Sequence, residues 1–193
     1  MKGKIIVASA NKGKLFEFAE MLPDYEIVGY KEYADFEIEE NGKTFEENAL
    51  IKARAIHKIT GGNVLADDSG LLVDALGGAP GVYTARYAGE NATADDNMDK
   101  LLEVLKGEAN RKAEFRCCLA FIDETGKETV TFGVVKGSIT TERRGTNGFG
   151  YNPIFFSEEL NKTFGEAGEE EKNKISHRGR AIESLKERLA QNK

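Results

Sequence analysis

The sequence predicts an α/β fold with a mixed sheet, and two observations support this prediction. In the first half of the chain, apolar strand-like runs alternate with segments of helical periodicity, as in parallel β-α-β units. In the second half, two segments of alternating apolar and polar residues flank residues 123–126 (DETG), a sequence typical of a hairpin turn. A sheet that holds both kinds of strand is mixed rather than purely parallel.

The first predicted strand and helix lie near the N-terminus. Residues 4–8 (KIIVA) form a short apolar run that indicates a buried strand. A helix to about Leu22 follows, because apolar residues recur on one helix face: Leu15, Phe18, Ala19 and Leu22. Pro23 and Asp24 then end this helix.

A second helix is predicted to begin after Thr44, since residues 44–47 (TFEE) match a capping box. The apolar face of this helix contains Phe45, Ala49, Ala53 and Ile56. A short strand at residues 64–66 follows and leads into the acidic pair Asp67 and Asp68. We therefore expect the two aspartates at the carboxyl end of a strand.

The remaining predicted elements complete the mixed sheet. A glycine-rich stretch at residues 77–89 precedes a helix at about residues 92–105. The two hairpin strands have alternating apolar residues: Phe115, Cys117, Leu119 and Phe121 in one, and Val130, Phe132 and Val134 in the other. Residues 145–152 form a glycine-rich loop with two aromatics, and Ser176 caps a last helix.

The composition argues against several classes of protein. The 193 residues suffice for one domain, or for one domain with two lobes. The formal net charge of −6 argues against a duplex-DNA-binding protein, which usually has a basic face. No apolar run approaches the ~20 residues needed to cross a membrane. The adjacent Cys117 and Cys118 match neither a disulfide framework nor a metal motif, so we expect a cytoplasmic protein.

Two groups of residues are candidates for binding phosphate. Residues 9–14 (SANKGK) join the first strand to the first helix, where free N–H groups, a hydroxyl and two lysines suit a phosphate. The alternative is a solvated turn with an asparagine cap. Lys52 falls within the apolar stripe of the second helix, so it must reach solvent, form an ion pair or meet an anionic ligand.

Acidic residues are candidates for a metal site. Glu39 and Glu40 precede a turn, and Asp67 and Asp68 follow a strand. Mg²⁺ prefers one or two carboxylates together with substrate phosphates, and a nearby carboxylate can accept a proton from water. The alternative is ordinary turn chemistry, which also favours aspartate.

The C-terminal third contains two further candidates. The aromatic residues of residues 149–153 (FGYNP) can stack on a base, or can anchor the loop in the core. Lys172 is a third basic candidate beside His177 and Arg178, which lie in the first turn of the last helix, where the helix dipole disfavours cations. An acceptor such as a phosphate or a base carbonyl would offset this cost, and so would exposure to solvent.

The order of these motifs resembles the inosine triphosphate pyrophosphatase family, which removes non-standard purine nucleoside triphosphates. The motifs run through nearly the whole chain: Ser9-x-Asn11-x-x-Lys14, Glu40-x-Gly42-x-Thr44-Phe45-x-Glu47-Asn48-Ala49-x-x-Lys52, Ala66-Asp67-Asp68-Ser69-Gly70-Leu71, Ala75-Leu76-Gly77-Gly78-x-Pro80-Gly81, Phe149-Gly150-Tyr151-x-Pro153 and Glu171-Lys172-Asn173-x-x-Ser176-His177-Arg178. One departure is Asn152, where the family usually has aspartate.

The resemblance implies the fold and the reaction. It implies a long curved mixed sheet flanked by helices, with a cleft between two lobes, and a homodimer. The implied reaction is the Mg²⁺-dependent hydrolysis of ITP, dITP or XTP to the nucleoside monophosphate and pyrophosphate. It implies neither a nucleic acid nor a membrane as partner.

The resemblance also implies a role for each matching residue. Glu40 and Asp68 would bind the metal, and Asp68 would be the general base. The residues expected at the substrate are Ser9, Ala10, Asn11, Lys12, Gly13, Lys14, Lys52, Ser69, Phe149, Gly150, Tyr151, Asn152, Lys172, His177 and Arg178. His177 and Arg178 are hydrogen-bond donors that suit the C6 carbonyl of hypoxanthine or xanthine and not the amino group of adenine.

Two alternatives stay open at this point. One is a pyrophosphatase for modified pyrimidine nucleotides, which a panel of substrates would distinguish. The other is a purine-nucleotide sensor without catalytic activity, which would bind ITP tightly with Mg²⁺ but not hydrolyse it.

Overall fold

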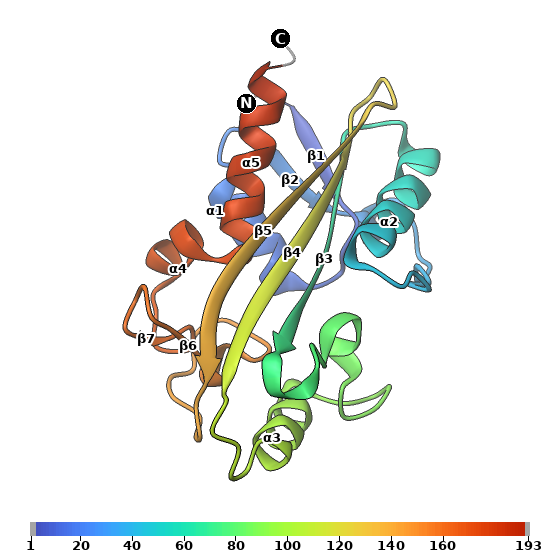
Figure 1. Cartoon of the computed structure of the whole chain (residues 1–193). Coiled ribbons are helices and arrows are strands. Elements are labelled where there is room, and N and C mark those ends of the chain that lie inside the picture. The colour runs from blue at the N-terminus through green and yellow to red at the C-terminus, as the bar shows by residue number, and fades with distance from the viewer. Residues whose placement is uncertain (1–2, 192–193) are drawn as a thin grey trace. The chain divides into compact units, whose positions relative to one another are not determined.

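A computed structural model of the chain describes residues 3–191, and it has the predicted mixed α/β architecture (Figure 1). The strands of its sheet are β1 (Lys4–Val7), β2 (Glu26–Gly29), β3 (Val64–Val73), β4 (Lys112–Ile122), β5 (Glu128–Ile139), β6 (Phe155–Ser157) and β7 (Lys162–Thr163). Within the described residues these seven strands are ordered β2-β1-β3-β4-β5-β6-β7. β1 pairs in parallel with β2 and β3, whereas β6 is antiparallel to β5 and β7, so the sheet is mixed as predicted.

The predicted helices occur in the predicted order, and the described residues contain a further α-helix, Glu169–Ile175, that was not predicted. The α-helices are α1 (Lys12–Met21), α2 (Phe45–Thr60), α3 (Ala94–Val104), α4 (Glu169–Ile175) and α5 (His177–Gln191). Short 3-10 helices occupy Tyr30–Glu32, Asp74–Leu76, Gly81–Arg86 and Asn152–Ile154. None of the helices in the described part of the chain combines the length and the apolar character that a membrane span requires.

The chain forms two compact units, each with its own core. The first unit contains the described residues up to Asp68, then Cys117–Gly133, and then the described residues from Arg178 onward. The second unit contains Ser69–Arg116 and Val134–His177. β3, β4 and β5 therefore contribute residues to both units. The chain length suggested one domain, or one domain with two lobes, and this stays a prediction.

Strand alternation gives the first unit two separate cores, one on each face of its part of the sheet. Leu65 of β3 and Cys117 of β4 pack with α1 and α5, through residues such as Phe18 and Ile182. The neighbouring residues in sequence, such as Ala66 and Cys118, pack with α2 on the other face. Within the first unit, the residues of β3 thus alternate between the two helical layers, and this alternation continues into the two aspartates.

The second unit has a single core built around the ends of three long strands. Leu71 and Val73 of β3 pack with Leu101 of α3 and with a group of aromatic rings: Phe115, Tyr151, Phe155 and Phe164. The rings of Phe115 and Phe155 lie with centroids 4.5 Å apart, within the usual range for interacting aromatics. This core supports the loop that precedes Tyr151.

One predicted strand boundary is wrong. β3 does not end before Asp67 but continues through both aspartates to Val73. Aspartate is disfavoured in buried strands because burial removes its charged carboxylate from water, which is unfavourable without a partner. Here Lys14 and Arg178 pair with the buried carboxylate of Asp67, and these partners lie far from it in sequence.

Three smaller expectations also differ from the structure. Ala19 is exposed although it was predicted on the apolar face of α1. Thr44 caps α2 by accepting the N–H of Glu47, but the Glu47 carboxylate accepts the N–H of Lys43 instead of closing the capping box. Phe132 is 56% exposed, although the alternation of β5 predicted it on a buried face.

Candidate active site

The loop between β1 and α1, a candidate for binding phosphate, is a turn capped by an asparagine. The Ser9 hydroxyl accepts the N–H of Asn11 at 3.1 Å, and the Asn11 side chain accepts the N–H of Lys14 at 3.2 Å. Asn11 is the N-cap of α1, a helix of ten residues. The exposed loop residues are Ala10, Asn11 and Lys12, whereas Ser9, Gly13 and Lys14 are half-buried. Helix N–H groups and lysine ammonium groups at one turn favour an anionic ligand.

Asp67 connects this turn to the start of α5. Its Oδ2 atom lies 3.0 Å from Lys14 Nζ and 3.1 Å from an Arg178 guanidinium nitrogen. Arg178 also pairs with Glu17 of α1. Burial opposes ionisation of Asp67, but the charges of Lys14, Arg178 and Lys52 outweigh burial and hold the pKa of Asp67 far below its usual range. Asp67 is therefore a permanent anion among cations.

Asp68 lies on the opposite face of β3, beside α2. Burial of this carboxyl, together with the negative charge of Glu40, raises the pKa of Asp68 to about 6, against opposing effects of Lys52, Asn48 and Lys14. Its Oδ2 atom accepts the amide N–H of Asn48 at 3.0 Å. A carboxylate of this kind is ionised at neutral pH and accepts a proton more readily than an ordinary aspartate.

Lys52 is the cation of this second group. It is only 6% exposed, and its Nζ atom lies 3.2 Å from Glu40 Oε2. Burial disfavours its charged form, but Asp67, Glu40 and Asp68 together raise the pKa of Lys52 above its ordinary value. The sequence allowed Lys52 to reach solvent, to form an ion pair or to meet an anionic ligand. The structure shows an ion pair with Glu40.

Asn48 joins the Glu40 loop to Asp68. The Asn48 side-chain oxygen accepts the N–H of Gly42 at 2.8 Å, while its amide nitrogen donates to Asp68. A Cβ atom at Gly42 would lie 2.6 Å from that oxygen, so only glycine permits this approach. The amide thus fixes both the loop two residues after Glu40 and the carboxylate that is the candidate base.

The second unit contains the residues predicted to recognise the base. Lys172 is 3% exposed and its Nζ atom lies 3.0 Å from Glu169 Oε2. Gly148 has a left-handed backbone, with φ of 72°, and a Cβ atom there would lie 2.1 Å from Asn152 Nδ2 and 3.5 Å from Lys172 Nζ. The loop at Gly148 therefore packs directly over Asn152 and Lys172.

The two aromatic residues of this loop have different surroundings. The Tyr151 ring is 3% exposed within the core, and its hydroxyl donates to the carbonyl of Thr84 at 2.7 Å. Phe149 is half-buried, as is Gly150. The contacts of Tyr151 are those of the anchoring alternative, and a direct role for it in binding a base stays a prediction.

His177 and Ser69 are the other predicted site residues of the second unit. The His177 ring is 8% exposed and stacks on Phe115, with ring centroids 4.8 Å apart. Ser69 is half-buried in β3, directly after Asp68. The predicted site residues thus lie in both units, with ion pairs at Asp67 and Lys52 in the first unit and at Lys172 in the second.

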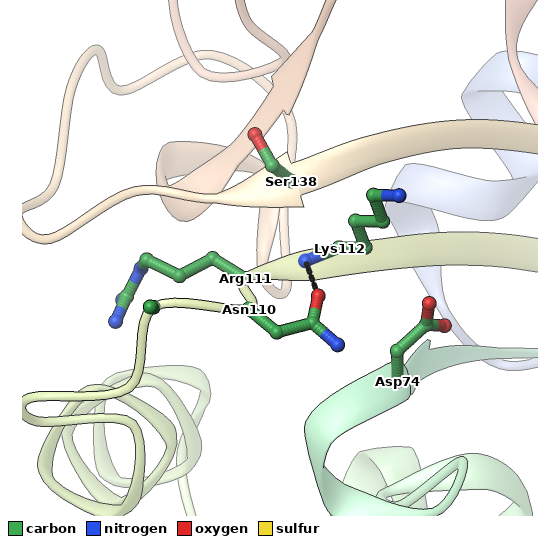
Figure 2. Close-up of a pocket in the computed structure, with 6 residues that line it drawn as sticks. Asp74, Asn110, Arg111, Lys112 and Ser138 are labelled. Atoms are coloured by element: carbon green, nitrogen blue, oxygen red, sulfur yellow. Dashed lines mark hydrogen bonds between the residues drawn. The ribbon is translucent and has the colours of Figure 1, made fainter.

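A pocket of about 600 Å³ in the second unit contains none of the predicted site residues. Its lining comes from Asp74, Ala109, Asn110, Arg111, Lys112 and Ser138 (Figure 2). The Arg111 guanidinium donates to the carbonyls of Leu105, Ile139 and Thr140, so its hydrogen bonds serve the fold. The Asn110 side chain accepts the N–H of Lys112 at 3.2 Å (Figure 2).

Glu17 and Asn48 contact predicted site residues of the first unit but were not themselves predicted there. Glu17 follows Lys14 by three residues on α1 and is 4% exposed, and Asn48 is 3% exposed on α2. A carboxylate one turn after Lys14 and an amide next to Ala49 on a buried helix face were the available signals. Their partners, Arg178 and Asp68, are 161 and 20 residues away in sequence, which periodicity does not reveal.

The fold and the site residues of the first unit define a class of protein. An α/β protein that places a helix N-terminus, two lysines and several carboxylates at one strand has the groups that bind a polyphosphate with a divalent cation. The chain belongs to the Ham1 family, whose model matches residues 5–188. This membership confirms the resemblance predicted from the ordered motifs.

The chain is similar over nearly its whole length to the following relatives. The dITP/XTP pyrophosphatase of Staphylococcus epidermidis is 49% identical over 187 residues, which are 96% of this chain and 95% of that one. The solved structure of the Staphylococcus aureus Ham1 protein has a TM-score of 0.88 and 44% identity, covering 98% of this chain and 100% of that chain. A nucleoside-triphosphatase / dITP/XTP pyrophosphatase from Mycobacterium abscessus has a TM-score of 0.75 and 43% identity, over 94% and 98%.

Proposed function

We propose that this protein is a nucleoside-triphosphate pyrophosphatase that hydrolyses dITP, XTP and ITP to the monophosphate and pyrophosphate. The observation that carries the proposal is the buried Lys52 beside the carboxylates of Glu40 and Asp68. A buried ammonium with two carboxylates suits a ligand that arrives as a polyanion with a divalent cation. The near full-length identity to dITP/XTP pyrophosphatases supports the choice of substrate.

Mg²⁺ is the proposed cofactor, and the donor set fits it. Among residues 3–191, no group of three or more His, Cys, Asp or Glu side chains is arranged to hold a metal ion. Mg²⁺ does not need such a group, because it is commonly held by one or two carboxylates together with substrate phosphates. Glu40 and Asp68 would supply these carboxylates. When bound, Mg²⁺ neutralises phosphate charge and helps to orient the attacking water.

The residues of the first unit would bind the triphosphate and accept the proton. Lys14, Lys52 and the N–H groups at the start of α1 bind phosphate oxygens by charge and hydrogen bonding. Asp68 accepts a proton from the water that attacks phosphorus at the α–β anhydride, and a P–O bond of the bridging oxygen breaks to release the monophosphate and pyrophosphate. Asn48 keeps the Asp68 carboxylate in one orientation through its 3.0 Å hydrogen bond. Asp67 stays ionised and does not take the role of base.

Base recognition is assigned to the loop and helix residues of the second unit together with Arg178. Phe149, Asn152, Lys172 and His177 supply an aromatic face and hydrogen-bond donors. Donors match the C6 carbonyl of hypoxanthine and xanthine, whereas the amino group of adenine would meet another donor. A buried polar group without a partner costs enough to produce strong discrimination against ATP.

We also propose a cytoplasmic homodimer, with no nucleic acid and no membrane as partner. The family resemblance supports the dimer, and the net charge of −6 supports the absence of a DNA partner. Light scattering coupled to gel filtration measures the assembly directly. A mass near twice the chain mass of 21.2 kDa is expected, and a mass near one chain would contradict the dimer.

The experiment that tests the reaction is incubation with ITP and Mg²⁺, followed by separation of the products. IMP and pyrophosphate are expected in equal amounts. IDP and orthophosphate would show that the enzyme cleaves a different bond. Tight binding of ITP without any product would instead indicate a nucleotide sensor, and faster turnover of modified pyrimidine triphosphates in the same panel would indicate the other alternative.

A further inference from the structure

A single oxygen atom of Asp67 links two residues with different proposed tasks. Asp67 Oδ2 lies 3.0 Å from Lys14 Nζ and 3.1 Å from a guanidinium nitrogen of Arg178, which also pairs with Glu17. Lys14 belongs to the turn proposed to bind phosphate, and Arg178 to the residues proposed to read the base. No step of the proposed hydrolysis uses Asp67, so its burial between two cations needs another explanation.

The burial of this group makes its geometry rigid. Asp67 is 1% exposed, Arg178 3% and Glu17 4%, so water does not screen their charges as it does at a surface. The Arg178 guanidinium is a flat fork, and carboxylates at two of its nitrogens fix both its position and its plane. Within this group of residues, Asp67 is the carboxylate that forms an ion pair with Lys14.

Strand alternation separates Asp67 from the candidate base. Asp67 lies on the face of β3 that packs against α1 and α5, with Leu65, whereas Asp68 lies on the α2 face with Ala66. Replacement of Asp67 therefore does not remove the hydrogen bond from Asn48 to Asp68. The two aspartates are adjacent in sequence but separable by experiment.

We infer that Asp67 is a positioning residue that couples recognition of the base to binding of the triphosphate, through its shared contact with Lys14 and Arg178. The inference rests on the proposed function, because it uses the tasks proposed for these two cations. Asp67 holds Arg178 in the orientation that favours a C6 carbonyl, and it holds Lys14 where the phosphates bind. Asp67 forms ion pairs with both Arg178 and Lys14, and Glu17 forms one with Arg178, so Glu17 is expected to act chiefly on base recognition.

The test compares Asp67→Asn with the matched variant Glu17→Gln. Two quantities are measured: the ratio of kcat/KM for ITP over ATP, and the inhibition constant of tripolyphosphate, which has no base. For Asp67→Asn, the ratio falls about tenfold or more and tripolyphosphate binds about tenfold more weakly, since each lost contact is a charge-assisted hydrogen bond. For Glu17→Gln, the ratio falls but the inhibition constant stays within about twofold.

These readouts separate positioning from a purely structural role. A variant that merely unfolds more easily loses active enzyme for every substrate equally, so neither the ratio nor the inhibition constant changes. If folded Asp67→Asn keeps either quantity at the wild-type value, the inference is wrong. If wild-type protein makes no IMP and pyrophosphate from ITP, the proposed function fails instead, and the two failures are therefore distinguishable.

A measurement on the wild-type protein decides the question if Asp67→Asn does not fold. Tripolyphosphate with Mg²⁺ is added while the guanidinium ¹⁵N signals are followed by NMR, with Arg178→Lys used to assign Arg178. A shift of the Arg178 signal on binding a ligand without a base supports the coupling. An Arg178 signal that stays unchanged at saturating tripolyphosphate overturns it.

Discussion

At the scale of single residues, adjacent carboxylates in β3 have opposite acid–base properties. The cations Lys14 and Arg178 keep Asp67 ionised, whereas burial and Glu40 raise the pKa of Asp68 to about 6. The cause is strand alternation, which points consecutive side chains at different helices. Asp67 is therefore suited to fix the positions of cations, whereas Asp68 is suited to accept a proton, although both residues are aspartates.

Asp68→Asn is predicted to lower kcat for ITP by a factor of about 10²–10⁴, the usual contribution of a general base. The fold should persist, because an asparagine oxygen at this position can still accept the hydrogen bond from Asn48. Steady-state pyrophosphate release measures kcat, and circular dichroism checks the fold. Glu183→Gln, which removes an exposed carboxylate on α5, is the control and should keep normal turnover. Near-normal turnover of Asp68→Asn would remove Asp68 from the role of base.

The same substitution is predicted to stabilise the metal-free protein near neutral pH. A carboxyl group whose pKa is about 6 in the folded state, against about 3.9 when unfolded, opposes folding once it is ionised. This penalty is absent below about pH 4, grows between pH 4 and 6, and is complete above pH 6. Asp68→Asn should therefore be more stable than wild type by about 1–3 kcal/mol at pH 7.5.

Urea unfolding in EDTA across this pH range measures the difference in stability. The gain from Asp68→Asn is expected to shrink as the pH falls from 6 to 4. A gain that does not vary with pH would have another origin, and equal stability at pH 7.5 would show that the Asp68 carboxyl is not held at a raised pKa.

At the scale of secondary structure, periodicity predicts elements well where one face is buried against a helix. The α2 stripe and the β4–β5 hairpin follow this rule, and their predicted positions are confirmed. Two positions do not follow it. β3 continues through Asp67 because cations distant in sequence pair with that carboxylate, and Phe132 is exposed although its strand alternates. For the same reason Lys52 was recognisable as a buried cation, but its partner Glu40 was not determined by spacing alone.

The loop that precedes Tyr151 gives a prediction at this scale. Gly148→Ala should raise KM for ITP about tenfold, because the new Cβ atom would lie 2.1 Å from Asn152 Nδ2 and displace it. Binding of tripolyphosphate should be unchanged, because the residues proposed to bind phosphate lie in the first unit. The control is Gly107→Ala, which has a similar φ of 78° but no atom within 4 Å of its Cβ.

Both glycine variants carry the backbone strain of a left-handed residue, of roughly 1–2 kcal/mol. Only Gly148→Ala adds the steric conflict, so only it should change KM. Equal effects of the two variants on KM would show that the loop at Gly148 does not influence substrate binding.

At the scale of the whole molecule, three strands contribute residues to both compact units. Leu65 and Leu101 are fully buried, one in each unit, so they allow a test of the predicted single domain. Leu65→Ala is expected to cost about 2–5 kcal/mol of stability. If the chain unfolds as one cooperative domain, global exchange of amides in α2 and α3 should accelerate by the same factor, and Leu101→Ala should do likewise. Hydrogen exchange by mass spectrometry at low urea measures both helices in one experiment. If exchange accelerates only in the unit that carries the substitution, the two units unfold independently. The loss of stability in one unit would then not affect the other, although they share strands.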